Sequence, residues 1–206
     1  MPSNKRQTVR IIGGKWKRRK LVVTNAEGLR PTLDRVRESL FNWLNLELSG
    51  ARVLDLYAGT GALGFEALSR GAARATFVDS DTRVAAELEK AATALEAPAT
   101  IVCSDATSWL ERQTQSWDIV FLDPPFDNQQ HPNILDLLDH HLETGAFVYL
   151  ERPRQAEFTH PKYEVWKKSF AGEVSFALLR LRTFCLCPIG CWASIAANIG
   201  VQACRQ

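Results

Sequence analysis

Short apolar runs alternate with helical segments through the middle of the chain, and this alternation constrains the fold more than any other feature. The runs predict five strands, at 52–56, 75–79, 100–103, 118–122 and 146–150. Segments with helical spacing follow them, at 60–70, 82–95, 107–113 and 134–142. Because short connections carry the chain from strand to helix and back, the pattern predicts a parallel sheet covered on both faces.

Further elements are expected on both sides of this alternation. Upstream, Thr32 is placed to cap a helix whose apolar residues recur from Leu33 to Leu48 along one face. Downstream of Glu151, the stretches 163–168 and 176–181 predict two adjacent strands with a turn between them. We expect this antiparallel hairpin to close a seven-stranded, mostly parallel α/β sheet.

Basic residues are concentrated at the start of the chain. Residues 1–20 carry eight lysines and arginines and no acid, whereas the rest carries a net charge of −6 and the whole chain +2. This distribution favours an arm that contacts a polyanion. The stretches 11–14 and 21–23 flank the basic cluster 15–20 and predict a small hairpin, with a solvated arm as the alternative. Since no signal-peptide pattern follows the first charges, we expect a cytoplasmic protein.

The loop after the first predicted strand contains glycines in a pattern typical of ligand-binding turns. Gly59 and Gly61 allow sharp turns and a close approach of the backbone to a ligand, next to the free N–H groups of a helix. Asp55 precedes them, where a carboxylate would repel a pyrophosphate but suit a cationic amino group. The loop therefore indicates a nucleoside that carries an amino acid, and an NAD-binding protein is the weaker alternative.

Two further acids follow the next two predicted strands. Asp79 ends the second strand, where it is placed to accept hydrogen bonds from ribose hydroxyls, and Asp105 follows the third, where it could accept one from an adenine amine. Each acid alone is equally explained as a loop residue or a helix cap. Together with Asp55 they occupy three successive strand ends, which favours a binding role.

The fourth predicted strand ends in the motif Asp123-Pro124-Pro125-Phe126. Prolines stiffen the chain and remove backbone donors, so the Asp123 carboxylate and the Pro124 carbonyl can both accept from one external amine. Two acceptors would draw the amine lone pair out of conjugation with a nucleobase, while Phe126 offers a face for stacking. A rigid turn that merely ends the strand is the alternative.

These motifs resemble those of a known group of enzymes. The order of Asp-x-Tyr-x-Gly-x-Gly at 55–61, a second-strand acid and Asp-Pro-Pro-Phe resembles class I S-adenosylmethionine-dependent methyltransferases that act on exocyclic amines. More narrowly, the stretches 10–16, 30–44 and 53–70 are similar to the RsmD family of bacterial 16S rRNA guanine-N2 methyltransferases. The resemblance implies a Rossmann-like fold, S-adenosyl-L-methionine as cofactor, and methylation of guanosine 966 of 16S rRNA, in the small subunit or its assembly intermediate.

The resemblance also implies roles for particular residues. Asp123, Pro124 and Phe126 would hold a flipped guanine, and the amine proton would pass to Asp123 or to water. The cofactor would be bound at its methionine part, ribose and adenine by Asp55, Tyr57, Gly59, Gly61, Asp79 and Asp105. The family more often has Glu at the second-strand position. Phosphate contacts would come from Lys15, Lys17, Arg18, Arg19, Arg35 and Arg37, although Arg35 and Arg37 could instead pair with local acids such as Asp34 and Glu38.

We therefore expect three parts: a basic arm at 1–30, a methyltransferase domain at 31–182 and an atypical apolar tail at 183–206. The tail contains four of the five cysteines, but neither a zinc site nor a membrane helix fits its spacing and composition. We expect no metal and a monomer. A DNA adenine-N6 or cytosine-N4 methyltransferase, a protein glutamine methyltransferase and a non-catalytic rRNA-binding assembly factor remain as alternative functions.

Overall fold

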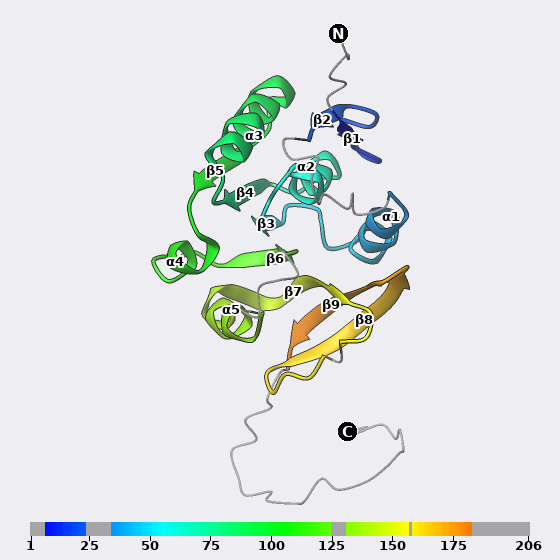
Figure 1. The fold of residues 1–206 in the computed structure, drawn as a ribbon, viewed down its shortest axis with the longest axis vertical. Coiled ribbons are helices and arrows are strands. Elements are labelled where there is room, and N and C mark those ends of the chain that lie inside the picture. Colours follow the sequence, from blue (N-terminus) through cyan, green and yellow to red (C-terminus); the bar gives the residue numbers. More distant parts are fainter. Residues whose placement is uncertain (1–6, 24–33, 125–130, 157, 183–206) are drawn as a thin grey trace, which may run out of the picture.

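The computed structural model describes residues 7–23, 34–124, 131–156 and 158–182. These residues form a seven-stranded sheet in the order β5-β4-β3-β6-β7-β9-β8 and a separate hairpin, β1-β2 (Figure 1). The strands are β1 (Thr8–Arg10), β2 (Lys20–Val22), β3 (Arg52–Leu56), β4 (Arg74–Asp79), β5 (Ala99–Cys103), β6 (Trp117–Leu122), β7 (Leu142–Pro153), β8 (Tyr163–Ala171) and β9 (Val174–Leu181). The helices are α1 (Asp34–Trp43), α2 (Ala62–Ser69), α3 (Thr82–Leu95), α4 (Ala106–Leu110), α5 (His131–Leu138) and the 3-10 turn η1 (Asp139–His141).

The sheet has the predicted topology. Strands β5, β4, β3, β6 and β7 pair in parallel, whereas β9 pairs antiparallel with both β7 and β8. The α/β fold class is therefore confirmed. From β3 the chain moves outward to β4 and β5 and then crosses back to β6, so the strand order reverses between β3 and β6. In open α/β sheets, ligands bind at the carboxyl ends of the strands at such a switch point.

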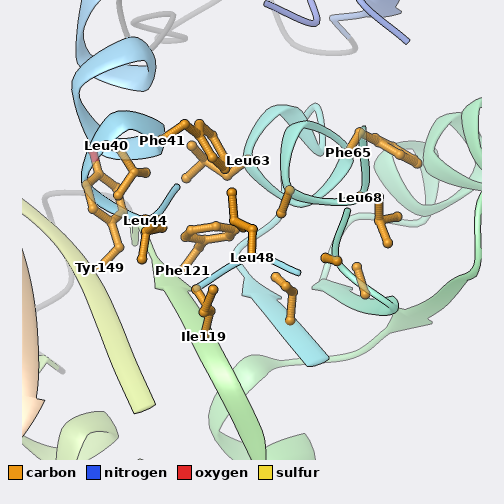
Figure 2. Close-up of a cluster of buried hydrophobic side chains, with 14 of the residues drawn as sticks. Leu40, Phe41, Leu44, Leu48, Leu63, Phe65, Leu68, Ile119, Phe121 and Tyr149 are labelled. Carbon is orange, nitrogen blue, oxygen red and sulfur yellow. The ribbon is translucent and has the colours of Figure 1, made fainter. Parts of the chain in front are cut away.

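Helices cover both faces of the sheet. Helices α1, α2 and α3 pack on one face, and α4 and α5 pack on the other. Figure 2 shows how α1 contributes, because its Leu40 and Phe41, together with Leu44 just after the helix, lie over Phe121 and Tyr149 of the sheet. The rings of Phe41 and Phe121 meet edge to face with their centroids 5.9 Å apart. This packing fixes the carboxyl ends of β6 and β7 relative to α1.

Several element boundaries differ from the predicted ones. Helix α1 ends at Trp43, although Leu44 and Leu48 beyond it are buried as expected. The fifth predicted strand is longer, since β7 runs from Leu142 to Pro153. The predicted cap Thr32 and the tail 183–206 lie outside the described residues. No helix within the described ranges is both long and apolar enough to cross a bilayer.

The first strand of the hairpin is Thr8–Arg10, not the predicted stretch 11–14, because residues 12–16 bond to α2 instead. Glu66 of α2 accepts the backbone N–H groups of Ile12 and Gly13 at 2.6 and 2.7 Å. The Ser69 hydroxyl accepts from the Trp16 backbone N–H at 2.9 Å and donates to the Gly13 carbonyl at 2.6 Å. The hairpin is therefore docked on α2 and is not a solvated arm.

Candidate functional site

Acidic side chains gather at the carboxyl ends of four neighbouring strands. Asp79 ends β4, Asp55 lies one residue before the end of β3, Asp123 follows β6, and Glu151 lies near the end of β7. Leu122 of β6 pairs with Leu150 of β7, so the next residues in register are Asp123 and Glu151. The four acids thus line the switch-point edge of the sheet, where the sequence predicted three of them.

Asp55 is buried with little to stabilise its charge. Its side chain is almost wholly inaccessible and accepts one backbone N–H, from Gly64, at 2.9 Å. The pKa of Asp55 is raised to about 8, mainly by burial and also by the nearby charge of Asp79, while the bond from Gly64 opposes the rise. A cationic group at this position would stabilise the carboxylate, which fits the amino group of a methionine moiety.

The raised pKa predicts how stability depends on pH. The unfolded chain releases the Asp55 proton near pH 4 and the folded chain near pH 8, so the folded state binds more protons between these values. The free energy of unfolding should therefore fall as the pH rises through this window. Urea denaturation at a series of pH values should show a shallower fall in Asp55→Asn, and identical slopes in both proteins would contradict the assignment.

The glycine loop after β3 has a strained backbone braced by Asp79. Tyr57, Gly59 and Gly61 have φ values of 62°, 53° and 70°, which glycine adopts far more readily than tyrosine. The two carboxylate oxygens of Asp79 accept the backbone N–H groups of Gly59 and Asp81, each at 2.9 Å. A carboxylate has about four acceptor positions, so this bracing leaves capacity for ribose hydroxyls.

Gly61 cannot accept a side chain, and this gives a prediction about the loop. A Cβ atom there would lie 2.6 Å from Leu88 and 2.8 Å from Phe65. We expect Gly61→Ala to displace the loop and weaken binding of S-adenosylhomocysteine at least about tenfold, since the strained turn costs of order 1–3 kcal/mol. Isothermal titration calorimetry checks this, with Gly145→Ala as control because its φ of 82° carries similar backbone strain while a Cβ there meets no atom within 4 Å. Equal affinity in Gly61→Ala and wild type would overturn the prediction.

Tyr57 and Asp105 lie near each other beyond β3 and β5. Burial raises the pKa of the half-buried Tyr57, the charge of Asp105 adds to the rise, and a hydrogen bond with Thr107 opposes it. Asp105 is exposed and caps α4, accepting the Ser108 backbone N–H at 2.9 Å. Its role as a helix cap is therefore shown, and its remaining acceptor positions leave the adenine contact as a proposal.

Asp123 is half-buried and lies beside the buried acids Asp55 and Glu151. Desolvation holds the pKa of Asp123 well above its usual range, and the charges of Glu151 and Asp55 add to the rise. The Tyr149 hydroxyl donates to Glu151 Oε1 at 2.5 Å, and burial together with Glu151 raises the pKa of Tyr149. Pro124 is buried. Phe126 lies outside the described residues.

Glu151 joins the site although no role was predicted for it from the sequence. It follows the apolar run of β7 directly, just as Asp123 follows that of β6. This strand-end position is the signal that could have identified it. In the sequence, Glu151 only marked the point at which the alternation stops.

The basic residues expected to contact RNA fall into two groups. Lys15, Lys17, Arg18 and Arg19 are exposed on the loop between β1 and β2. This loop lies beside the last turns of α2 and α3, where Arg19 donates to the carbonyl of Ala94 at 3.2 Å. Those turns lead to the starts of β4 and β5, so the loop and the acids lie at opposite ends of the strands.

Arg35 and Arg37 have different environments although both lie on α1. Arg35 is exposed, whereas Arg37 is 0% exposed and pairs with Asp34 at 2.5 Å. The structure therefore removes Arg37 from the expected phosphate contacts and favours the local ion pair. The physical reason is its helical phase, since Arg37 precedes the buried Leu40 and Phe41 by three and four residues.

The strand-order reversal, the braced glycine loop and the row of strand-end acids together define a Rossmann-like methyltransferase. Enzymes of this class take their methyl group from S-adenosylmethionine, and the acids and free backbone groups around the loop suit that molecule. The chain belongs to the family described as Conserved hypothetical protein 95, which matches residues 9–180. This membership confirms the RsmD-family resemblance.

Individual relatives agree with the family. The chain is 42% identical over 175 residues to "Ribosomal RNA small subunit methyltransferase D" of Escherichia coli, covering 82% of this chain and 88% of that protein. The solved structure of Escherichia coli yhhF is 40% identical with a TM-score of 0.77, covering 85% of this chain and 98% of that one. The Thermus thermophilus 16S rRNA N2 G1207 methyltransferase RsmC, solved with AdoMet and guanosine, shares the fold at 21% identity and a TM-score of 0.66, covering 86% and 50%.

Proposed function

We propose that this protein methylates the exocyclic N2 amine of a guanosine, position 966, in 16S rRNA of the small ribosomal subunit. The observation that carries the proposal is the placement of Asp123, directly followed by Pro124, beside the buried Asp55 and the glycine loop. An amine acceptor pair thus lies next to a loop suited to a methyl donor. The printed name of the Escherichia coli relative supports small-subunit rRNA as the substrate.

The cofactor would be bound by the residues around the glycine loop. S-adenosylmethionine, when bound, supplies an electrophilic methyl group on a positively charged sulfur. Asp55 would pair with the amino group, because its buried carboxyl has one hydrogen bond and no cationic partner among the described residues. Asp79 would accept the ribose hydroxyls while it braces Gly59, and Asp105 would accept the adenine amine next to Tyr57.

Asp123 would orient the target amine. In our proposal its carboxylate and the Pro124 carbonyl each accept one N–H, so the nitrogen lone pair points toward the methyl donor. A base in a helix cannot reach this edge, and the guanine must therefore leave its stack, with Phe126 as a stacking face. The raised pKa of Asp123 suits it to receive the proton that the methylated nitrogen releases, with water as the other acceptor.

The basic loop would contact phosphates away from the target nucleotide. Because this loop and the acids lie at opposite ends of the strands, the bound RNA would extend along the face covered by α1, α2 and α3. Phosphate contacts position an RNA without reading its sequence, and Arg35 would add to them from α1. We place residues 31–182 in the methyltransferase domain and the docked hairpin in the arm at 1–30. In this proposal the protein acts in the cytoplasm as a monomer.

Removing the charges of this loop should weaken RNA binding without affecting the chemical step. We expect combined alanine substitution of Lys15, Lys17 and Arg18 to lower affinity for 16S rRNA and to reduce the salt-dependence slope by about 0.7–0.9 per lost phosphate contact. The value of kcat at saturating RNA should stay near that of wild type. Filter binding across a salt series measures this, with Arg112→Ala as control because Arg112 is exposed just after α4, on the other face of the sheet. An unchanged slope would exclude the loop from the RNA contacts.

Methyl transfer tests the proposed function directly. Radiolabelled S-adenosylmethionine is supplied with small subunits that lack the modification, or with free 16S rRNA, and the product is digested to nucleosides. N2-methylguanosine is the expected product. In parallel reactions with DNA or with protein as substrate, methylated adenine or cytosine would favour the DNA methyltransferase alternative, and methylated glutamine the protein methyltransferase. If the protein binds rRNA but not the cofactor, it is a non-catalytic assembly factor.

A further inference from the structure

Two carboxyl side chains lie directly opposite each other at the end of the sheet. Asp123 and Glu151 follow the paired residues Leu122 and Leu150 on neighbouring strands, and both continue the face that carries Phe121 and Tyr149. Neighbouring parallel strands are about 4.8 Å apart, which sets the spacing of the two groups. Since the proposed function uses only Asp123, the second carboxyl has no role in it.

Glu151 is held in place rather than free to reorient. Its side chain is only 6% exposed, and the Tyr149 hydroxyl donates to its Oε1 atom at 2.5 Å. A carboxylate accepts about four hydrogen bonds, so the bond from Tyr149 leaves acceptor capacity. Because the two carboxyls lie side by side on neighbouring strands, they form a pair of acceptors, which points to a ligand that presents two adjacent N–H groups.

The Watson–Crick edge of guanine presents such a pair of donors. Its N1–H and its exocyclic N2 amine are neighbours, whereas adenine has an acceptor at N1 and cytosine an acceptor at N3. An acceptor at that position would face the Glu151 carboxylate and be repelled. A site built to accept a hydrogen bond discriminates strongly against an analogue that lacks the donor.

We propose that Glu151 accepts a hydrogen bond from N1–H of the target base and thereby selects guanine, while Asp123 holds the N2 amine. This inference rests on the proposed function, because it concerns how the same site recognises its base. Glu151 is then a residue that determines specificity, and Tyr149 is a positioning residue that holds it.

Substitution of a single base tests this role. The substrate is 16S rRNA with either guanosine or 2-aminopurine at the target, assembled into small subunits. 2-Aminopurine keeps the exocyclic amine but has an unprotonated N1. We expect wild type to prefer guanosine by at least about 100-fold in kcat/KM, and Glu151→Gln to lower this preference to below about tenfold, because its amide N–H can donate to the unprotonated N1. Glu143→Gln, at the other end of β7, should keep the wild-type preference.

The outcomes separate this inference from the proposed function. If wild type does not methylate the guanosine substrate, the proposed function fails. If it does, but Glu151→Gln loses activity equally on both substrates, Glu151 is structural and the inference fails. The wild-type comparison is a second test that does not depend on the folding of any variant. Similar wild-type rates on guanosine and on 2-aminopurine would overturn the inference.

Discussion

Asp123→Ala should lose methyl transfer by at least about 100-fold in kcat/KM while it still binds S-adenosylhomocysteine. The carboxyl is the group proposed to hold the amine and receive its proton, and general acid–base groups typically contribute 10²–10⁴-fold. Since the glycine loop, Asp55 and Asp79 are unchanged, cofactor affinity should stay within a few-fold of wild type. Single-turnover methylation of small subunits and calorimetry measure the two quantities.

The same substitution should not destabilise the fold. Burial and the charges of Glu151 and Asp55 raise the pKa of Asp123, so the ionised carboxyl opposes folding. The contribution of Asp123 to the free energy of unfolding therefore falls as the pH rises. At neutral pH, Asp123→Ala should therefore unfold at a urea concentration equal to or above that of wild type. Asp136→Ala, an exposed aspartate of α5, is the control and should keep full activity. Loss of activity together with marked instability would indicate a structural role for Asp123.

Glu66→Ala should cause the largest loss of stability. Glu66 is 0% exposed, accepts two backbone N–H groups of the hairpin, and pairs with Arg70 at 2.7 Å. Removing one partner of such a buried network typically costs about 3–5 kcal/mol, because the remaining groups stay buried without partners. We expect the variant to unfold at much lower urea and the basic loop to separate from α2.

Two comparisons make the test of Glu66 specific. Glu89→Ala, at an exposed position of α3, should change the free energy of unfolding by no more than about 0.5 kcal/mol. Limited proteolysis should cleave the hairpin faster in Glu66→Ala than in wild type, whereas cleavage within the sheet should differ less. If the hairpin stays protected and the stability is unchanged, Glu66 does not hold it.

Helix α3 shows what local pattern can predict. Its bounds, Thr82–Leu95, equal the predicted ones, because apolar residues recur with helical spacing and Asp81 caps the first turn by accepting the Arg83 backbone N–H. The strands of the parallel sheet were predicted within a few residues for a similar reason, since each is a continuous apolar run between polar connections. Such signals lie within one segment and need no knowledge of its neighbours.

Glu66 shows where local pattern fails, and Arg37 shows where charge alone misleads. Both are charged residues on helices, and charge alone predicts a solvent-facing position. Arg37 is nevertheless in phase with the buried residues of α1, and Glu66 is buried because the hairpin docks on it. The burial of Glu66 thus depends on a distant segment that covers it, whereas that of Arg37 follows from its phase on the helix.

The sequence by itself determined the order of the elements, the glycine loop and three of the four strand-end acids, because these are properties of single segments. Only the tertiary structure decided that Glu151 lies opposite Asp123 and that the basic loop lies at the other end of the strands from the acids. The register between β6 and β7 and the docking of the hairpin on α2 create these relations. Both arise from contacts between residues far apart in the chain, which the periodicity of one segment does not encode.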